Sequence, residues 1–160
     1  MTKNEILHVV HILAFLAKIN SVIDPAEKGI FKIVCERFKI ENSDLKIILK
    51  ESFSLKESLD ELHSKESKRI LVNLIVLMAS VDGYICDSEE KSIFKIMDSL
   101  GECTQDYFYF NDNGSLDLQT VIDNELNILS DLPPTHPIYA SIYTKFFLCY
   151  NIFIFYELNL

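Results

Sequence analysis

A repeated phrase constrains the fold of this chain more than any other feature. Residues 18–33 read KINSVIDPAEKGIFKI, and residues 80–96 read SVDGYICDSEEKSIFKI. In both copies an apolar helical segment leads into a short acidic turn, and a second helical segment follows. Each hairpin can bury its apolar face against the other. The repeat therefore predicts an all-α fold: a pseudo-twofold helical bundle of two repeated helix-turn-helix units, plus a C-terminal helical extension.

The two copies differ by one residue in length. Residues 30–33 align with residues 93–96 at an offset of 63, whereas Asn20 aligns with Asp82 at an offset of 62. The second copy thus has one extra residue between its first helix and the cap of its second. It also has Gly83 where the first copy has Ser21. A glycine at this place lets the chain leave a helix in a left-handed conformation.

The composition favours helices within a single domain. Apolar residues make up 49% of the 160 residues, which is enough for a large core, and Gly and Pro occur only four times each. A sandwich or barrel needs many turns, so this scarcity of Gly and Pro disfavours both. We expect a helical repeat core over residues 1–104. Residues 105–160 are expected to form a loop and a C-terminal helical extension packed on the same domain.

Apolar periodicity and capping residues predict the individual helices. Thr2 and Glu5 have capping-box spacing ahead of the first helix, and Asp24 and Pro25 suit the start of the second. Gly101 suits the end of the sixth. The helix at 65–81 is apolar nearly all round, so we expect it at the centre. The expected helices span about 3–19, from 24 onward, 42–52, 55–63, 65–81, 87–100, 116–132 and from 137 onward, while residues 106–118 form either a hairpin or an aromatic loop.

The two acidic turns carry oxygen ligands of the kind that hard divalent cations prefer. In the second turn Asp82, Asp87 and one of Glu89 or Glu90 can converge on a small volume, and Ca²⁺ or Mg²⁺ is bound by such groups. The alternating acids of an EF-hand loop are missing, so this is a different kind of site. The candidate metal ligands of both turns are Asp82, Asp87, Glu89, Glu90, Asn20, Asp24 and Glu27.

The same acids have a second interpretation as helix caps. Asp87 and Glu90 have capping-box spacing, and Asp82 with Gly83 suits the end of a helix. Carboxylates at helix starts are ordinary partners of the helix dipole. Spacing alone favours this capping role over a metal site.

The stretch LMASVDGYICDSEEKSIFKIM at 77–97 combines an apolar helix, the pattern Ala-x-x-Asp-Gly-x-Val/Ile, a few polar residues, a Glu and a second amphipathic helix. This pattern resembles the signature of the TerB-like tellurite-resistance family, also seen in the N-terminal domain of a membrane-anchored DnaJ-like co-chaperone. The family spacing of seven residues after Asp82 selects Glu89, whereas the extra residue and the helical register favour Glu90. The residues that carry the resemblance are Ala79, Asp82, Gly83, Ile85, and Glu89 or Glu90.

The resemblance covers roughly residues 5–101, and the first copy keeps the family spacing from Asn20 to Glu27. It implies an all-α fold of two related halves and a metal site between the two turns. It also implies a role in stress-response or membrane-associated assemblies rather than catalysis. Asn20 and Ser21 depart from the pattern, which has Asp and Gly at these positions. Asn can still offer calcium a carbonyl oxygen, but it brings no charge. The segment after about 103 does not match the family.

Charge and cysteine usage restrict the partners and the compartment. The formal net charge is −9, from 24 acids and 15 bases. This disfavours nucleic acid, since phosphate binding needs a basic face. We expect a protein partner and peripheral association with a membrane protein. The four scattered cysteines form no CxxC motif, which favours a reducing, cytoplasmic location. The apolar tail at 146–160 is shorter than the ~20 residues of a membrane span, so we interpret it as a buried helix.

No pattern in the sequence indicates a catalytic site. Glu5-x-x-His8 has di-iron spacing, but the core helices supply no further inward Glu. His8 and His11 lie three apart without other ligands, and such pairs seldom bind metal. We expect a non-enzymatic binding or scaffold domain that takes Ca²⁺ or Mg²⁺. The alternative is a small acidic protein-interaction (immunity-type) protein without metal; a helical enzyme with an unrecognised site and a structural assembly module stay open.

Overall fold

The computed structural model describes residues 1–19, 25–48, 54–124 and 128. Within these residues the fold is all-α, as predicted, with seven α-helices, one short 3-10 helix and no strand. The elements are α1 (Lys3–Ile19), α2 (Pro25–Arg37), α3 (Asn42–Ile48), α4 (Leu55–Asp60), α5 (Lys65–Ser80), α6 (Asp87–Leu100), η1 (Thr104–Asp106) and α7 (Leu118–Asp123).

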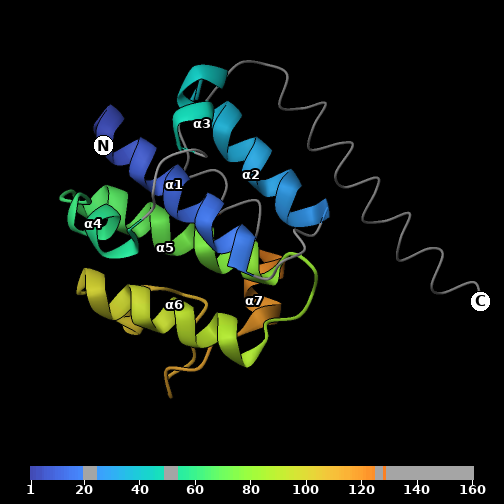
Figure 1. The fold of residues 1–160 in the computed structure, drawn as a ribbon. Helices are drawn as coiled ribbons and strands as arrows, with labels where there is room; N and C mark the ends of the chain where they lie inside the picture. Colours follow the sequence, from blue (N-terminus) through green and yellow to red (C-terminus); the bar gives the residue numbers. More distant parts are fainter. Residues whose placement is uncertain (20–24, 49–53, 125–127, 129–160) are drawn as a thin grey trace, which may run out of the picture.

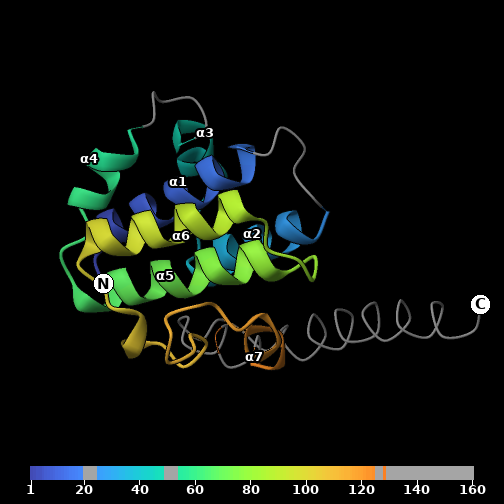
Figure 2. The ribbon, with the colours of Figure 1, turned by 90° about the horizontal axis from the view of Figure 1, so that it is seen from below.

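Helix α5 is the central helix of the bundle. It packs against α1, α2, α6 and α7, and the two views agree in placing these helices around it (Figures 1 and 2). Eleven of its sixteen residues are buried, including Leu71, Val72 and Val76. The prediction that this segment lies at the centre is therefore confirmed. None of the described helices is long and apolar enough to cross a membrane.

Capping residues set the helix starts, with one correction. The box at α1 is confirmed, because the Thr2 backbone N–H donates to Glu5 Oε2 at 2.8 Å and the Glu5 N–H donates to Thr2 Oγ1 at 3.2 Å. At α6 the N-cap is Cys86, whose N–H donates to Glu89 Oε2 at 2.9 Å. The residue that closes this box is therefore Glu89, and the predicted pairing of Asp87 with Glu90 is wrong.

The glycines at the ends of α5 and α6 have the conformation that the sequence predicts. Gly83 has φ +83° and Gly101 has φ +70°, both in the left-handed region. The N–H of Gly83 donates to the carbonyl of Ser80 at 2.9 Å, which closes the last turn of α5. These two positions end their helices without the strain that a side chain would add there.

One predicted helix is shorter in the structure, and one open alternative is decided. The helix at 55–63 ends at Asp60, because the backbone turns at Glu61 and the next residue, Leu62, is buried in the core. Residues 106–118 form an aromatic loop with one isolated antiparallel bridge, between Phe110 and Leu116, rather than a full hairpin. The predicted helix from 137, the tail at 146–160 and the ends of the 42–52 and 116–132 helices lie outside the described residues.

The aromatic loop shares the core of the helical repeat. Tyr107 and Tyr109 are buried, and the Tyr109 hydroxyl donates to Oδ1 of Asn73 in α5 at 2.8 Å. The rings of Phe94 in α6 and Phe110 lie 5.7 Å apart. The described part of 105–160 thus packs against α5 and α6.

The two hairpins present their connected ends on the same side of the molecule. α1 ends and α2 begins at the end of the bundle where α5 ends and α6 begins (Figures 1 and 2). The starts of α2 and α6, the two helices that follow the acidic stretches, therefore lie at this end.

Candidate functional site

A pocket lies between the two hairpins at this shared end. Its lining comes from four helices, and its volume is about 70 Å³. The apolar part of the lining is Leu16 from α1, Ile75, Met78 and Ala79 from α5, and Ile93 and Ile96 from α6. The polar part is Glu27 from α2 and Ser88, Glu89 and Ser92 from α6.

Glu27 and Glu89 are the predicted ligands that the structure brings to one pocket. Both are half-buried residues in the first turn of their helix, Glu27 in α2 and Glu89 in α6. Carboxylates in a first turn are favoured by the positive end of the helix dipole. Because Glu89 also accepts the Cys86 N–H, its side chain is held at the helix start. Two carboxylates from the two copies of the repeat therefore line one small space.

The other predicted ligands of the second turn do not line this pocket. Asp82 is exposed, and its Oδ1 accepts the Tyr84 N–H at 3.0 Å, which braces the turn. Asp87 is exposed at the first position of α6, and Glu90 is half-buried. Asn20 and Asp24 lie outside the described residues.

The described residues contain no cluster of three or more His, Cys, Asp or Glu side chains that could hold a metal ion. Asp82, Asp87 and Glu89 or Glu90 therefore do not converge on one point as a three-ligand group. The physical reason is that each carboxylate accepts a different backbone N–H. Asp82 accepts that of Tyr84 in the turn, and Glu89 accepts that of Cys86 at the start of α6.

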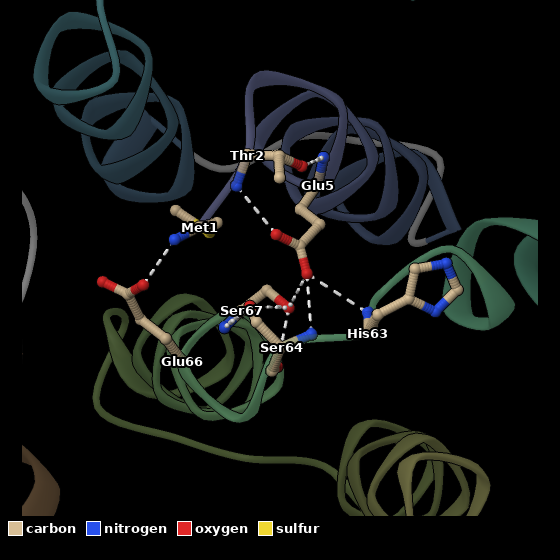
Figure 3. Close-up of polar contacts among 7 residues, drawn as sticks. All are labelled: Met1, Thr2, Glu5, His63, Ser64, Glu66 and Ser67. Carbon is tan, nitrogen blue, oxygen red and sulfur yellow. Dashed lines mark hydrogen bonds and ion pairs between the residues drawn. The ribbon is translucent and has the colours of Figure 1, made fainter.

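Glu5 has a role that its spacing to His8 did not predict. Its carboxylate is buried and joins the start of α1 to the start of α5 (Figure 3). Oε1 accepts the backbone N–H groups of His63 at 3.2 Å and Ser64 at 2.7 Å, and the Ser67 hydroxyl at 3.0 Å. The hydrogen bond from the Thr2 N–H, followed by those from Ser64 and Ser67, holds the pKa of Glu5 well below its usual range. The Glu5 carboxylate therefore has a structural role in joining α1 to α5, and not the role of an iron ligand.

The two histidines of α1 line a second cavity, between α1 and α3. This cavity has a volume of about 220 Å³ and is lined by Asn4, Leu7, His8, His11, Asp44, Ile47 and Ile48. His8, His11 and Asp44 do not form a metal-holding group. The carboxylate of Asp44 instead lies 3.5 Å from the ammonium of Lys3.

The three described cysteines differ in burial: Cys35 is buried, Cys86 is half-buried and Cys103 is exposed. Cys35, Cys86 and Cys103 are free thiols. Burial in the core raises the pKa of the Cys35 thiol to about 11, and nearby Glu36 adds to this. A thiol with a raised pKa is a poor nucleophile at neutral pH, so Cys35 is a packing residue.

The sequence predicts the charged residues of the pocket but not the other residues that line it. Glu27 and Glu89 follow from the repeat, because each stands in the first turn after an acidic stretch. Leu16, Met78 and Ser92 carry no such signal, since only the relative position of the two hairpins brings them to one surface.

Comparison with known proteins adds no relative: no family model matches the chain, and no curated protein or solved structure matches it significantly. The resemblance to the TerB-like family thus stays a prediction from Ala79, Asp82, Gly83, Ile85 and the following Glu.

Proposed function

We propose that this chain is a non-enzymatic TerB-like binding or scaffold domain, built on two related helical hairpins, which takes a divalent cation where the two acidic turns lie. The observation that carries this proposal is the pairing of Glu27 and Glu89, one from each repeat copy, in a single pocket. Ca²⁺ and Mg²⁺ are the cations that carboxylate oxygens suit. The domain would work in a stress-response or membrane-associated assembly.

The cation would be held chiefly by the two pocket carboxylates. Ca²⁺ takes six to eight oxygen ligands and retains water where the protein supplies fewer. Glu27 and Glu89 supply the first oxygens, and the acids of the second turn, Asp82, Asp87 and Glu90, lie next to Glu89 in the chain. Asn20 and Asp24 stand in the connection that precedes Glu27 and are the further candidates from the first copy. A site with this few placed carboxylates is expected to bind weakly.

A second function is favoured by a separate observation. The described residues hold no three-ligand group, and the chain carries a formal charge of −9. Both facts suit a small acidic protein-interaction (immunity-type) protein that meets a basic partner surface without a metal. The two functions differ in one measurable property, which is cation binding.

Isothermal titration calorimetry with Ca²⁺ and Mg²⁺ tests the proposal. We expect binding of at least one cation to the intact chain with a Kd of about 10⁻⁵–10⁻³ M. Glu27→Gln and Glu89→Gln should each weaken it by about tenfold or more, while Asp98→Asn, at an exposed acid near the other end of α6, should leave it unchanged. Absence of both heat and thermal stabilisation would remove the cation and leave the metal-free interaction protein.

A further inference from the structure

We propose that the pocket between the hairpins is the docking site for a basic linear segment of a partner protein. This segment inserts one aliphatic side chain between the helices and pairs its lysines or arginines with Glu27 and Glu89. The inference rests on the second function named above, the acidic protein that meets a basic partner surface without a metal, and it places that surface at this end of the bundle. It adds the chemistry of the partner, which the cation proposal does not specify.

The floor of the pocket selects an aliphatic group. Six of the ten lining residues are aliphatic or thioether side chains, contributed by α1, α5 and α6. The volume is about 70 Å³, whereas an engineered apolar cavity that accepts benzene measures about 150 Å³. The space therefore suits the branched end of a valine, leucine or isoleucine better than an aromatic ring.

The charges around the pocket select a basic neighbour for that aliphatic group. Glu27 and Glu89 reach the pocket from different helices, so a cationic side chain on either side of the inserted residue can meet a carboxylate. Asp82, Asp87 and Glu90 place further acids in the α5–α6 turn and the first turn of α6. An acidic segment would be repelled here, and the net charge of −9 extends the same preference over longer range.

The first experiment measures binding of a labelled synthetic peptide by fluorescence anisotropy, with the intact chain and EDTA present. The probe is a short peptide in which one leucine is flanked by lysines. Three matched peptides replace the leucine with serine, the leucine with phenylalanine, or the lysines with glutamate. We expect the probe to bind and each replacement to weaken binding by about tenfold or more.

Variants of the protein locate the binding site. Ser92→Leu fills the pocket, and Ser99→Leu is its matched control on the same helix. Both serine hydroxyls donate to the carbonyl four residues earlier, Ser92 to Ser88 at 2.7 Å and Ser99 to Lys95 at 2.8 Å, but Ser99 does not line the pocket. We expect Ser92→Leu to weaken probe binding by about tenfold and Ser99→Leu to leave it unchanged.

The charge variants are chosen to keep the fold. Glu89→Gln retains an oxygen that can accept the Cys86 N–H, since glutamine also serves at the third position of a capping box. The double variant Glu27→Gln, Glu89→Gln should bind the probe about tenfold more weakly, and its affinity for the probe should depend less on salt concentration. Asp98→Asn should change neither. If Ser92→Leu does not fold, the charge variants decide the outcome.

Three results would overturn the inference: no binding of the probe, equal binding of the leucine and phenylalanine peptides, or unchanged affinity in the Glu27→Gln, Glu89→Gln double variant. Failure here is distinct from failure of the proposed function. Cation binding in calorimetry without probe binding leaves the cation site and removes the peptide site, whereas probe binding in EDTA without cation binding does the reverse.

Discussion

Glu5 connects segments that are far apart in the sequence. One oxygen of its carboxylate accepts from the Thr2 N–H, and the other accepts from His63, Ser64 and Ser67, about sixty residues later (Figure 3). A buried carboxylate is tolerated only when its hydrogen bonds replace those of water. Since both helix starts donate to it, Glu5 fixes α1 against α5, and through them the position of the first hairpin.

Replacing Glu5 with glutamine should therefore destabilise the fold. The amide group would direct N–H atoms at a place where the protein presents donors, so at least one buried donor would lose its partner. We expect Glu5→Gln to lower the free energy of unfolding by about 2–3 kcal/mol, measured by urea denaturation. Glu66→Gln is the control, because Glu66 is 62% exposed and water screens its ion pair to the Met1 amine, so this variant should lose much less stability. Equal losses in the two variants would contradict the role of Glu5.

The same group predicts how stability depends on pH. The folded-state pKa of Glu5 is lowered from its ordinary value of 4.5. Its contribution is therefore complete above that value and is lost as the pH falls through 4.5 toward the folded-state pKa. Urea midpoints from pH ~7 to ~3 should show a gap between the wild type and Glu5→Gln that narrows only at the acid end. A gap independent of pH would show that the charge of Glu5 is not involved.

Thiol reactivity gives a third prediction at the scale of residues. Cys35 is buried with a pKa raised to about 11, whereas Cys103 is exposed. Since the thiolate is the reactive form, alkylation at neutral pH followed by peptide mapping should label Cys103 well before Cys35. Comparable labelling rates in the native protein would contradict the burial of α2 against the core.

At the scale of elements, the helix ends were the most predictable part of the fold. The Thr2–Glu5 box, Pro25 at the start of α2 and Gly101 after α6 are local signals that a few neighbouring residues determine. The start of α6 is only partly predictable, since the spacing favours Asp87 as the N-cap, whereas the N-cap in the structure is Cys86.

Interactions between distant segments were less predictable than helix ends. Nothing in the spacing of the sequence links Glu5 to the Ser64 N–H, or Asn73 to Tyr109, because such pairs exist only after the helices pack. For the same reason the repeat predicts the carboxylates of the candidate site, whereas its apolar lining follows only from how the helices pack.

The left-handed end of α6 provides a test at this scale. A Cβ at Gly101 would meet nothing within 4 Å, so the cost of a side chain there arises from its φ of +70° alone. Gly101→Ala should lower stability by about 1 kcal/mol, and Gly101→Asn should cost less, since asparagine tolerates this conformation. Thermal or urea denaturation of the pair decides the matter; an alanine variant as stable as the wild type would contradict the observed cap.

At the scale of the whole molecule, the fold brings the two helix starts that follow the acidic stretches to one end of the bundle. The α1–α2 hairpin packs on α5, and α6 follows α5 in the second hairpin. The starts of α2 and α6 come to the same end of the bundle (Figures 1 and 2). Duplication of a helix start therefore yields two carboxylates on one pocket, Glu27 and Glu89. A site formed this way depends on both copies and should not survive the loss of either carboxylate.

Amide chemical shifts during a Ca²⁺ titration test this joint site most directly. The account predicts that amides at 27–29 and at 82–90 shift together, with one shared Kd, and that Glu27→Gln reduces the shifts at 82–90 although it lies in the other hairpin. Shifts confined to one of the two stretches, or none at either, would contradict the account.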